Sequence, residues 1–118
     1  AGVAAPVPEA DRLELQARLA LRQNDLSSAG TWAVRAAAIR QEILDYRGMA
    51  RALAVAGSSA ERSGKLEAAA DLYLRAGRSA AAQSDPGTAR PWLEHVLRLT
   101  GDPATAEAAK TALTELQP

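Results

Sequence analysis

The feature that most constrains the fold is a segment that occurs twice, 40 residues apart. Residues 65–76 (KLEAAADLYLRA) match residues 25–36 (DLSSAGTWAVRA) in the placing of their apolar and small side chains. The same offset relates the segment before each copy, where Leu13 corresponds to Leu53 and Ala20 to Ala60. Self-similarity at a fixed period of about 20–50 residues is typical of stacked repeats, each of which buries its apolar face against its neighbours. The sequence therefore predicts an array of helical hairpins.

The composition indicates how such helices approach one another. Alanine accounts for 29 of the 118 residues and leucine for 15, whereas the chain has no phenylalanine and only two tryptophans and two tyrosines. Alanine is the best helix former, and with so few large rings the helices have to pack closely over alanine and glycine. No segment alternates apolar and polar residues as a strand does. The predicted fold class is therefore all-α, an α-α superhelix of about six antiparallel helices.

Apolar periodicity and turn residues place these helices along the chain. Gly64 is expected to end a helix, because glycine readily takes the positive φ of a helix C-terminus. Asn24 and Asp25 form an earlier turn, and Gly48 is the weak point at which a third helix starts late. Four of the expected helices are residues 8–23, 26–44, 66–83 and 103–116. A third helix follows a break at residues 45–48 and ends at residue 63, and a fifth ends before Gly101.

The start of the fifth helix has two possible positions. Asp85 followed by Pro86 places a capping aspartate before a proline in the first helical position. A helix that began at Pro86 would, however, carry Pro91 inside it, where proline lacks the helical N–H. A start near Thr88 is therefore favoured, and Pro86 stays the alternative.

Residues 1–10 (AGVAAPVPEA) are interpreted as a flexible leader, and residues 11–118 as a single domain of two clear helix pairs and a degenerate third. The leader lacks the charged start and the long apolar centre of an intact signal peptide. Two interpretations stay open for it. It is either a frayed terminus or the tether to the cell envelope that is left after an export signal is removed.

Charge and residue types argue against several classes of function. The 14 basic and 14 acidic residues balance, which is not expected of a protein that neutralises phosphates or anchors to a membrane through basic residues. No apolar run approaches the roughly 18 residues of a transmembrane helix. The chain has no cysteine and one histidine, His95, which is expected on the surface. No metal site, cofactor site or catalytic constellation is therefore expected, and the chain is predicted not to be an enzyme. Four arginines that lie close together in the sequence are the one local exception to this balance of charge, and they leave nucleic-acid binding as a further hypothesis: Arg35, Arg40, Arg47 and Arg51.

The repeated residues resemble the tetratricopeptide repeat family, whose helix pairs carry small residues, a glycine turn and a large aromatic residue at fixed spacings. The family's usual period is about 34 residues, so the offset of 40 resembles its longer-repeat branch. The resemblance covers roughly residues 12–100. Trp32, Tyr73 and Trp92 recur at equivalent positions of the repeats and are predicted to be core residues. The matching positions are Gly57, Ala60, Gly64, Ala69, Tyr73 and Ala76, and, in the upstream copy, Ala17, Ala20, Asn24, Ala29, Ala33 and Ala36.

The resemblance implies a superhelix whose first helices line a concave face to which partner proteins or peptides dock. Chaperone-binding members clamp a terminal carboxylate with lysine and asparagine, but here Glu14 and Ala54 stand where those residues would be needed, so that clamp is not expected. The arginines can still bind acidic groups in bidentate fashion, or they form solvated pairs with neighbouring acids. The residues that helical periodicity places in this groove are Asp11, Glu14, Arg18, Arg22, Arg51, Ala54, Ser58, Glu61 and Arg62.

The sequence is thus interpreted as a protein-interaction module, a scaffold or adaptor that binds a partner peptide or helix in the groove. The alternative is a structural component that self-associates end to end in the bacterial cell envelope or secretion machinery. Arginine outnumbers lysine 12 to 2, and together with the alanine excess this composition is typical of high-GC bacteria. The compartment stays open between cytoplasm and periplasm, since a chain without cysteine is stable in either.

Overall fold

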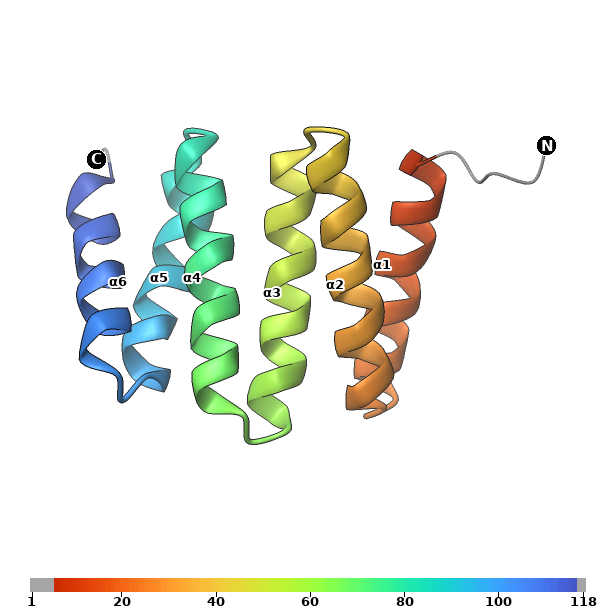
Figure 1. Ribbon diagram of the computed structural model, residues 1–118, viewed down its shortest axis with the longest axis horizontal. Coiled ribbons are helices and arrows are strands. Elements are labelled where there is room, and N and C mark those ends of the chain that lie inside the picture. Colours follow the sequence, from red (N-terminus) through yellow and green to blue (C-terminus); the bar gives the residue numbers. More distant parts are fainter. Residues whose placement is uncertain (1–5, 117–118) are drawn as a thin grey trace.

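The computed structural model describes residues 6–116, which form six helices joined by short turns (Figure 1). Each helix runs antiparallel to the next and packs against it, so that the helices stand side by side from α1 at one end to α6 at the other. No strand occurs within residues 6–116. The all-α fold class is confirmed. The helices are α1 (Pro6–Arg22), α2 (Leu26–Glu42), α3 (Tyr46–Arg62), α4 (Leu66–Ala82), α5 (Pro86–Leu99) and α6 (Pro103–Glu115).

The first helix begins two residues earlier than predicted, at Pro6. Ala10 is only 1% exposed and belongs to the core. Residues 6–10 of the predicted leader are therefore part of α1, while residues 1–5 lie outside the described residues. A proline at a helix start costs little, because its missing N–H would have no helical partner there.

The turns between the first five helices repeat every 20 residues. Each contains one residue of positive φ, followed by a residue whose N–H bonds to a carbonyl five positions back, such as Asp25 N to Ala20 O at 2.8 Å. This is the Schellman arrangement that closes a helix C-terminus, and here its last residue is also the N-cap of the next helix. The unit of the fold is thus a helix of 17 residues with its turn. The positive-φ residues are Asn24, Leu44, Gly64 and Ser84.

The boundaries on both sides of the second turn also differ from those predicted. Helix α2 ends before Leu44, whose φ of 62° is unfavourable for a side chain of this size. Helix α3 starts at Tyr46 and not at Gly48, because the carboxylate of Asp45 accepts a hydrogen bond from Gly48 N at 2.9 Å and caps the first turn.

Helix α5 begins at Pro86, so the start favoured from the sequence, Thr88, is wrong. Asp85 caps the helix by accepting a hydrogen bond from Thr88 N at 3.2 Å, and Pro91 lies inside it. Pro91 and Gly87 are both exposed. Water can therefore reach the Gly87 carbonyl that Pro91 leaves without a helical partner.

Two kinds of position recur along the core of the array: one is a buried residue in each helix, and the other is a small residue in the helix before it. The buried residue of each helix from α2 to α5 packs near a small residue of the helix before it. The ring of Tyr73 on α4 lies so close to Gly57 on α3 that a Cβ added there would be 3.0 Å from Tyr73 Cε2. Close packing of this kind leaves no room for an additional methyl group. The two sets are Leu13, Ala33, Leu53, Tyr73 and Leu93, and Ala17, Ala37, Gly57 and Gly77.

The third helix pair departs from this pattern. Helix α5 has 14 residues instead of 17, and Thr100 ends it in an extended conformation. The connection to α6 is held by Glu67 of α4, which accepts hydrogen bonds from Gly101 N at 2.6 Å and from Thr100 Oγ1 at 2.7 Å. Helix α6 packs on both α5 and α4. Among the helices described here, none has both the length and the apolar character needed to cross a membrane.

Candidate functional site

The most promising site is a groove of about 580 Å³ that the first helices of the three pairs share. Its walls come from α1, α3 and α5, and Tyr73 of α4 completes the floor. A volume of this size lies within the range of about 300–1,000 Å³ usual for ligand sites. We call it the arginine groove, and its lining residues are Arg18, Leu21, Arg22, Arg51, Ala54, Val55, Ser58, Tyr73, Thr88 and Trp92.

Five of the nine residues predicted to lie in the groove line the arginine groove: Arg18, Arg22, Arg51, Ala54 and Ser58. They come together because α1 and α3 are equivalent helices of successive repeats and present the same face. The other four predicted residues, Asp11, Glu14, Glu61 and Arg62, are engaged with groups of the protein itself.

Glu14 takes part in a charge network centred on a buried arginine. The side chain of Arg40 is 6% exposed; its Nη2 lies 2.7 Å from Asp11 Oδ1 and 3.4 Å from Glu14 Oε1, and its Nη1 lies 3.1 Å from Asp45 Oδ2. The other oxygen of Glu14 lies 3.2 Å from Arg18 Nη2 and 4.0 Å from Arg51 Nε. Buried charges require such partners. Glu14 therefore has a structural role at the edge of the groove.

The same network corrects the prediction of a surface arginine cluster. Arg40 cannot contribute to a basic surface with Arg35, because it is buried among three carboxylates. Arg47 donates to the carbonyl of Gln83 at 3.2 Å. The predicted groove residue Asp11 is likewise directed at Arg40.

Arg62 closes the end of a neighbouring helix. Its guanidinium donates to Leu21 O and to Asn24 Oδ1, both at 2.9 Å, and so satisfies groups at the C-terminus of α1. A cation at this position also interacts favourably with the helix dipole. Arg62 thus ties α3 to α1 and leaves the arginine groove to the other three arginines.

Glu61 belongs to a second polar cluster beside the groove. Its Oε1 lies 2.7 Å from His95 Nε2, and Arg98 Nη2 lies 3.2 Å from His95 Nδ1. The His95 ring stands edge-on to Tyr73, with centroids 4.9 Å apart and an interplanar angle of 87°. The surface position predicted for His95 holds only in part, since its side chain is 25% exposed and packs between Glu61, Arg98 and Tyr73.

Tyr73 connects this cluster to the floor of the groove. Burial raises the pKa of its phenol, the charge of Glu61 raises that pKa further, and a hydrogen bond with Ser58 acts in the opposite direction. The phenol is therefore neutral at physiological pH and can donate or accept a hydrogen bond at the groove.

Sequence reasoning missed the apolar half of the lining. Trp92 was predicted to be a core residue, but it is half-buried and lies in the groove, and Trp32 is also only partly buried. Both occupy the same place in their helices, where Leu72 and Ala52 also stand. Because Ala52 at the same place is fully buried, the sequence carried no signal that this position borders a surface.

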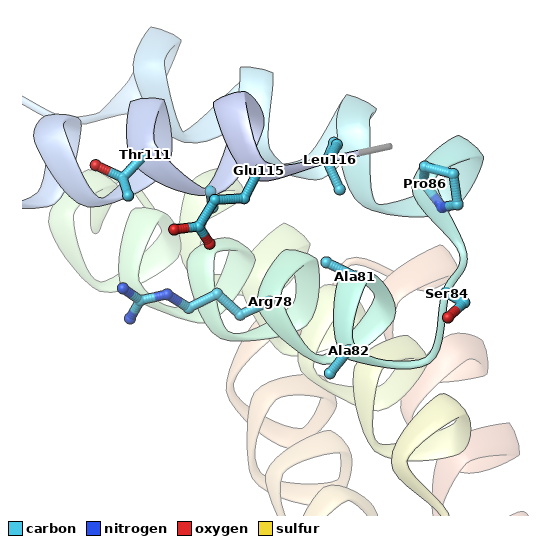
Figure 2. Close-up of a pocket in the computed structure, with 9 residues that line it drawn as sticks. Arg78, Ala81, Ala82, Ser84, Pro86, Thr111, Glu115 and Leu116 are labelled. Carbon is cyan, nitrogen blue, oxygen red and sulfur yellow. The ribbon is translucent and has the colours of Figure 1, made fainter. Parts of the chain in front are cut away.

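A second hollow, of about 570 Å³, lies between the ends of α4 and α6 (Figure 2). Arg78 on α4 and Glu115 on α6 come from opposite walls, and alanines form much of the lining. Its single cation is balanced by its single anion, so charge indicates no particular ligand. The arginine groove, whose charge is unbalanced, is the better candidate.

Residues 6–116 contain no group of three histidine, cysteine, aspartate or glutamate side chains that could hold a metal ion. Both ring nitrogens of His95 are occupied by Glu61 and Arg98. The polar groups that the groove presents are guanidiniums and hydroxyls, which bind and orient other molecules. The chain matches no family model, no curated protein and no solved structure.

Proposed function

We propose that this chain is a protein-interaction module of the tetratricopeptide repeat type, which holds a segment of a partner protein in the arginine groove. The observation that carries the proposal is the groove itself, a hollow of about 580 Å³ lined by residues of α1, α3 and α5. It combines cations at Arg18, Arg22 and Arg51 with an apolar floor that includes Trp92. Aromatic and arginine side chains are the residues that most often carry binding energy in protein interfaces.

A binding role is favoured over catalysis by the way the polar groups are used. Glu14, Glu61 and His95 have their partners within the protein. The groups left to face the groove are those of a recognition surface. In this role the chain acts as a scaffold or adaptor, and its rigid array of helices places the bound segment relative to other proteins.

The absence of cysteine gives a direct test. The variant Ser58→Cys carries a unique thiol in the groove, to which a photoreactive cross-linker is attached. The matched control Ala38→Cys places the same group on an exposed position of α2 outside the groove. On illumination in an extract of the cells that make the protein, a discrete partner should be cross-linked through Ser58→Cys only. Equal products from both positions would exclude the groove as the interaction site.

A second candidate is self-association in a larger assembly of the cell envelope or secretion machinery, and one observation favours it. On the outer face of α1, Leu15 is 69% exposed and Leu19 is 51% exposed. The equivalent residues of α3, Val55 and Ser59, are buried against the preceding helix pair. The double variant Leu15→Glu, Leu19→Glu should abolish any concentration-dependent association in sedimentation experiments. A wild-type chain that stays monomeric at high concentration would exclude this candidate.

A further inference from the structure

The charge of the arginine groove differs from that of the whole chain. The chain has 14 basic and 14 acidic residues, yet three arginines and no carboxylate line the groove. Arg18 and Arg22 come from α1 and Arg51 comes from α3, so the three guanidiniums approach the hollow from two sides. The planar fork of a guanidinium matches the geometry of a carboxylate. The groove is therefore complementary to a ligand that carries several negative charges.

The one carboxylate beside these arginines is already shared. Glu14 lies within 4.0 Å of Arg18, Arg40 and Arg51, so that a single negative charge serves three guanidiniums. Its Oε1 is buried and accepts no hydrogen bond within the described residues. Within residues 6–116, Arg22 forms no ion pair. The positive charge of the groove is thus only partly compensated from within the protein.

The remaining carboxylate on this side of α3 is directed away from the arginines. Glu61 is bound to His95 and does not line the groove. The rest of the lining combines apolar side chains, Ala54, Val55 and Trp92 among them, with three hydroxyl groups. A ligand that fits the arginines and the apolar lining together has acidic groups on the side of α1 and an apolar group that reaches the indole ring of Trp92.

We infer that the segment held in the groove is acidic, with at least two aspartate or glutamate side chains flanking one large apolar side chain. This inference rests on the proposed function and specifies the chemistry of its partner. The acidic side chains bind Arg22 and the pair Arg18 and Arg51, and the apolar side chain packs against Trp92. A carboxylate of the ligand that binds this pair takes the place of Glu14, which keeps Arg40 as its partner.

This geometry predicts that substitutions of the acidic residue and of the arginines at this site have opposite effects on binding. Glu14→Gln keeps the shape of the side chain but removes the negative charge that competes with the ligand, so it should tighten binding. Arg51→Gln and Arg22→Gln remove ligand contacts and should weaken it. Each arginine substitution should cost about tenfold or more in Kd, the factor for a charge-assisted hydrogen bond of roughly 1.4 kcal/mol.

The experiment is a selection from a library of random nonapeptides displayed on phage, with the full chain immobilised at low salt. Selection on the wild type should enrich peptides in which acidic residues flank an apolar one. Selection on the double variant Arg22→Gln, Arg51→Gln should lose this enrichment. The matched control is Arg90→Gln, which removes an exposed arginine of α5 that does not line the groove, and it should leave the enrichment unchanged.

The enriched sequence is then synthesised with a fluorescent label, and its Kd is measured by anisotropy for each variant. A copy with glutamine and asparagine in place of its acidic residues should bind at least tenfold more weakly to the wild type. Glu14→Gln should bind the acidic peptide more tightly than the wild type does. A Kd for Glu14→Gln equal to or weaker than that of the wild type, with an unchanged Tm, would contradict the proposed geometry.

The variant Ala54→Trp, which fills the floor of the groove, separates the two proposals. Enriched peptides that lack acidic residues but lose binding in Ala54→Trp would overturn the inferred chemistry and leave the proposed groove function standing. Peptides that bind equally to Ala54→Trp and to the arginine variants, or no enrichment at all, would overturn both. A single-stranded oligonucleotide that bound more tightly than the acidic peptide and depended on the same arginines would show that phosphate is the ligand, and the inference would be wrong.

Discussion

The contact between Gly48 and Arg40 offers a sharp test of how the first two repeats are held together. Gly48 lies in the first turn of α3, directly against the buried guanidinium of Arg40. A Cβ added to Gly48 would overlap Arg40 Nη1 and Asp45 Oδ2 and would lie 2.7 Å from Arg40 Cδ. Gly48→Ala is therefore expected to destabilise the fold, although alanine is the better helix former.

The magnitude follows from three terms. Overpacking a filled site costs about 1–3 kcal/mol. Displacing the guanidinium of Arg40 weakens its part-buried ion pair with Asp45, which is 3.1 Å long, and this adds a fraction of the about 3–5 kcal/mol that breaking a fully buried pair costs. The higher helix propensity of alanine offsets roughly 0.5–1 kcal/mol of this loss. We expect Gly48→Ala to lower the free energy of unfolding by about 3 kcal/mol.

The next repeat shows how the clash can be removed. There the residue equivalent to Arg40 is Ala80, and the residue equivalent to Gly48 is Thr88, which has a Cβ and is still capped by Asp85 at 3.2 Å. In an Arg40→Ala background, Gly48→Ala should therefore be neutral or slightly stabilising. The coupling energy of the double-mutant cycle should be about 3 kcal/mol.

The assay is urea denaturation followed by circular dichroism for the wild type, both single variants and the double variant. A Gly48→Ala substitution that is as harmful without Arg40 as with it would show that the guanidinium is not the obstacle. A stabilising effect of Gly48→Ala in the wild type would show that helix propensity outweighs the packing described here.

Three further predictions concern Tyr73, Ala69 and Arg62. Tyr73→Ala removes a ring that packs against Gly57 and His95 and should cost about 3–5 kcal/mol in urea denaturation; an unchanged midpoint would contradict the packing. Ala69 is fully buried, so Ala69→Leu should cost about 1–3 kcal/mol, and an unchanged Tm would count against this contact. Arg62→Gln removes the two bonds to α1 and should accelerate amide hydrogen exchange near Asn24 more than near Gly101, whereas uniform exchange would argue against its capping role.

The pKa of Tyr73 gives a prediction about pH. Because burial raises this pKa above its usual value of about 10, the unfolded chain releases the phenolic proton at a lower pH than the folded chain does. The contribution to stability is therefore fully present below about pH 10 and is lost as the pH rises further. Tyr73→Phe should show a smaller loss of stability above pH 10, and an equal loss in both proteins would mean that this phenol does not account for it.

Much of the fold could be predicted because its signals are local. The offset of 40 residues, the alanine content and Gly64 indicate antiparallel helices and one of their turns, and the structure has them. The error at Leu44 arose because a leucine rarely takes a positive φ, and only the repeated turn geometry requires it there. The error at Thr88 arose because Pro91 looked costly, whereas its exposure reduces the cost.

The candidate site was predictable in part for the same reason. Helical periodicity selected one face of α1 and one face of α3, and the structure brings Arg18, Arg22, Arg51, Ala54 and Ser58 around one groove. Periodicity could not show which charged residues would be engaged elsewhere, nor that a tryptophan from α5 would enter the lining.

The sequence by itself determined the helices, most of their ends and the small residues over which they pack, because these depend on neighbours within a few positions along the chain. Only the tertiary structure decided which charges are available to a partner. Arg40 meets Asp11 across 29 positions, and Arg62 meets Leu21 across 41. Such pairings depend on where the stacked helices place each side chain, and this placement distinguishes a buried ion pair from a surface that can bind.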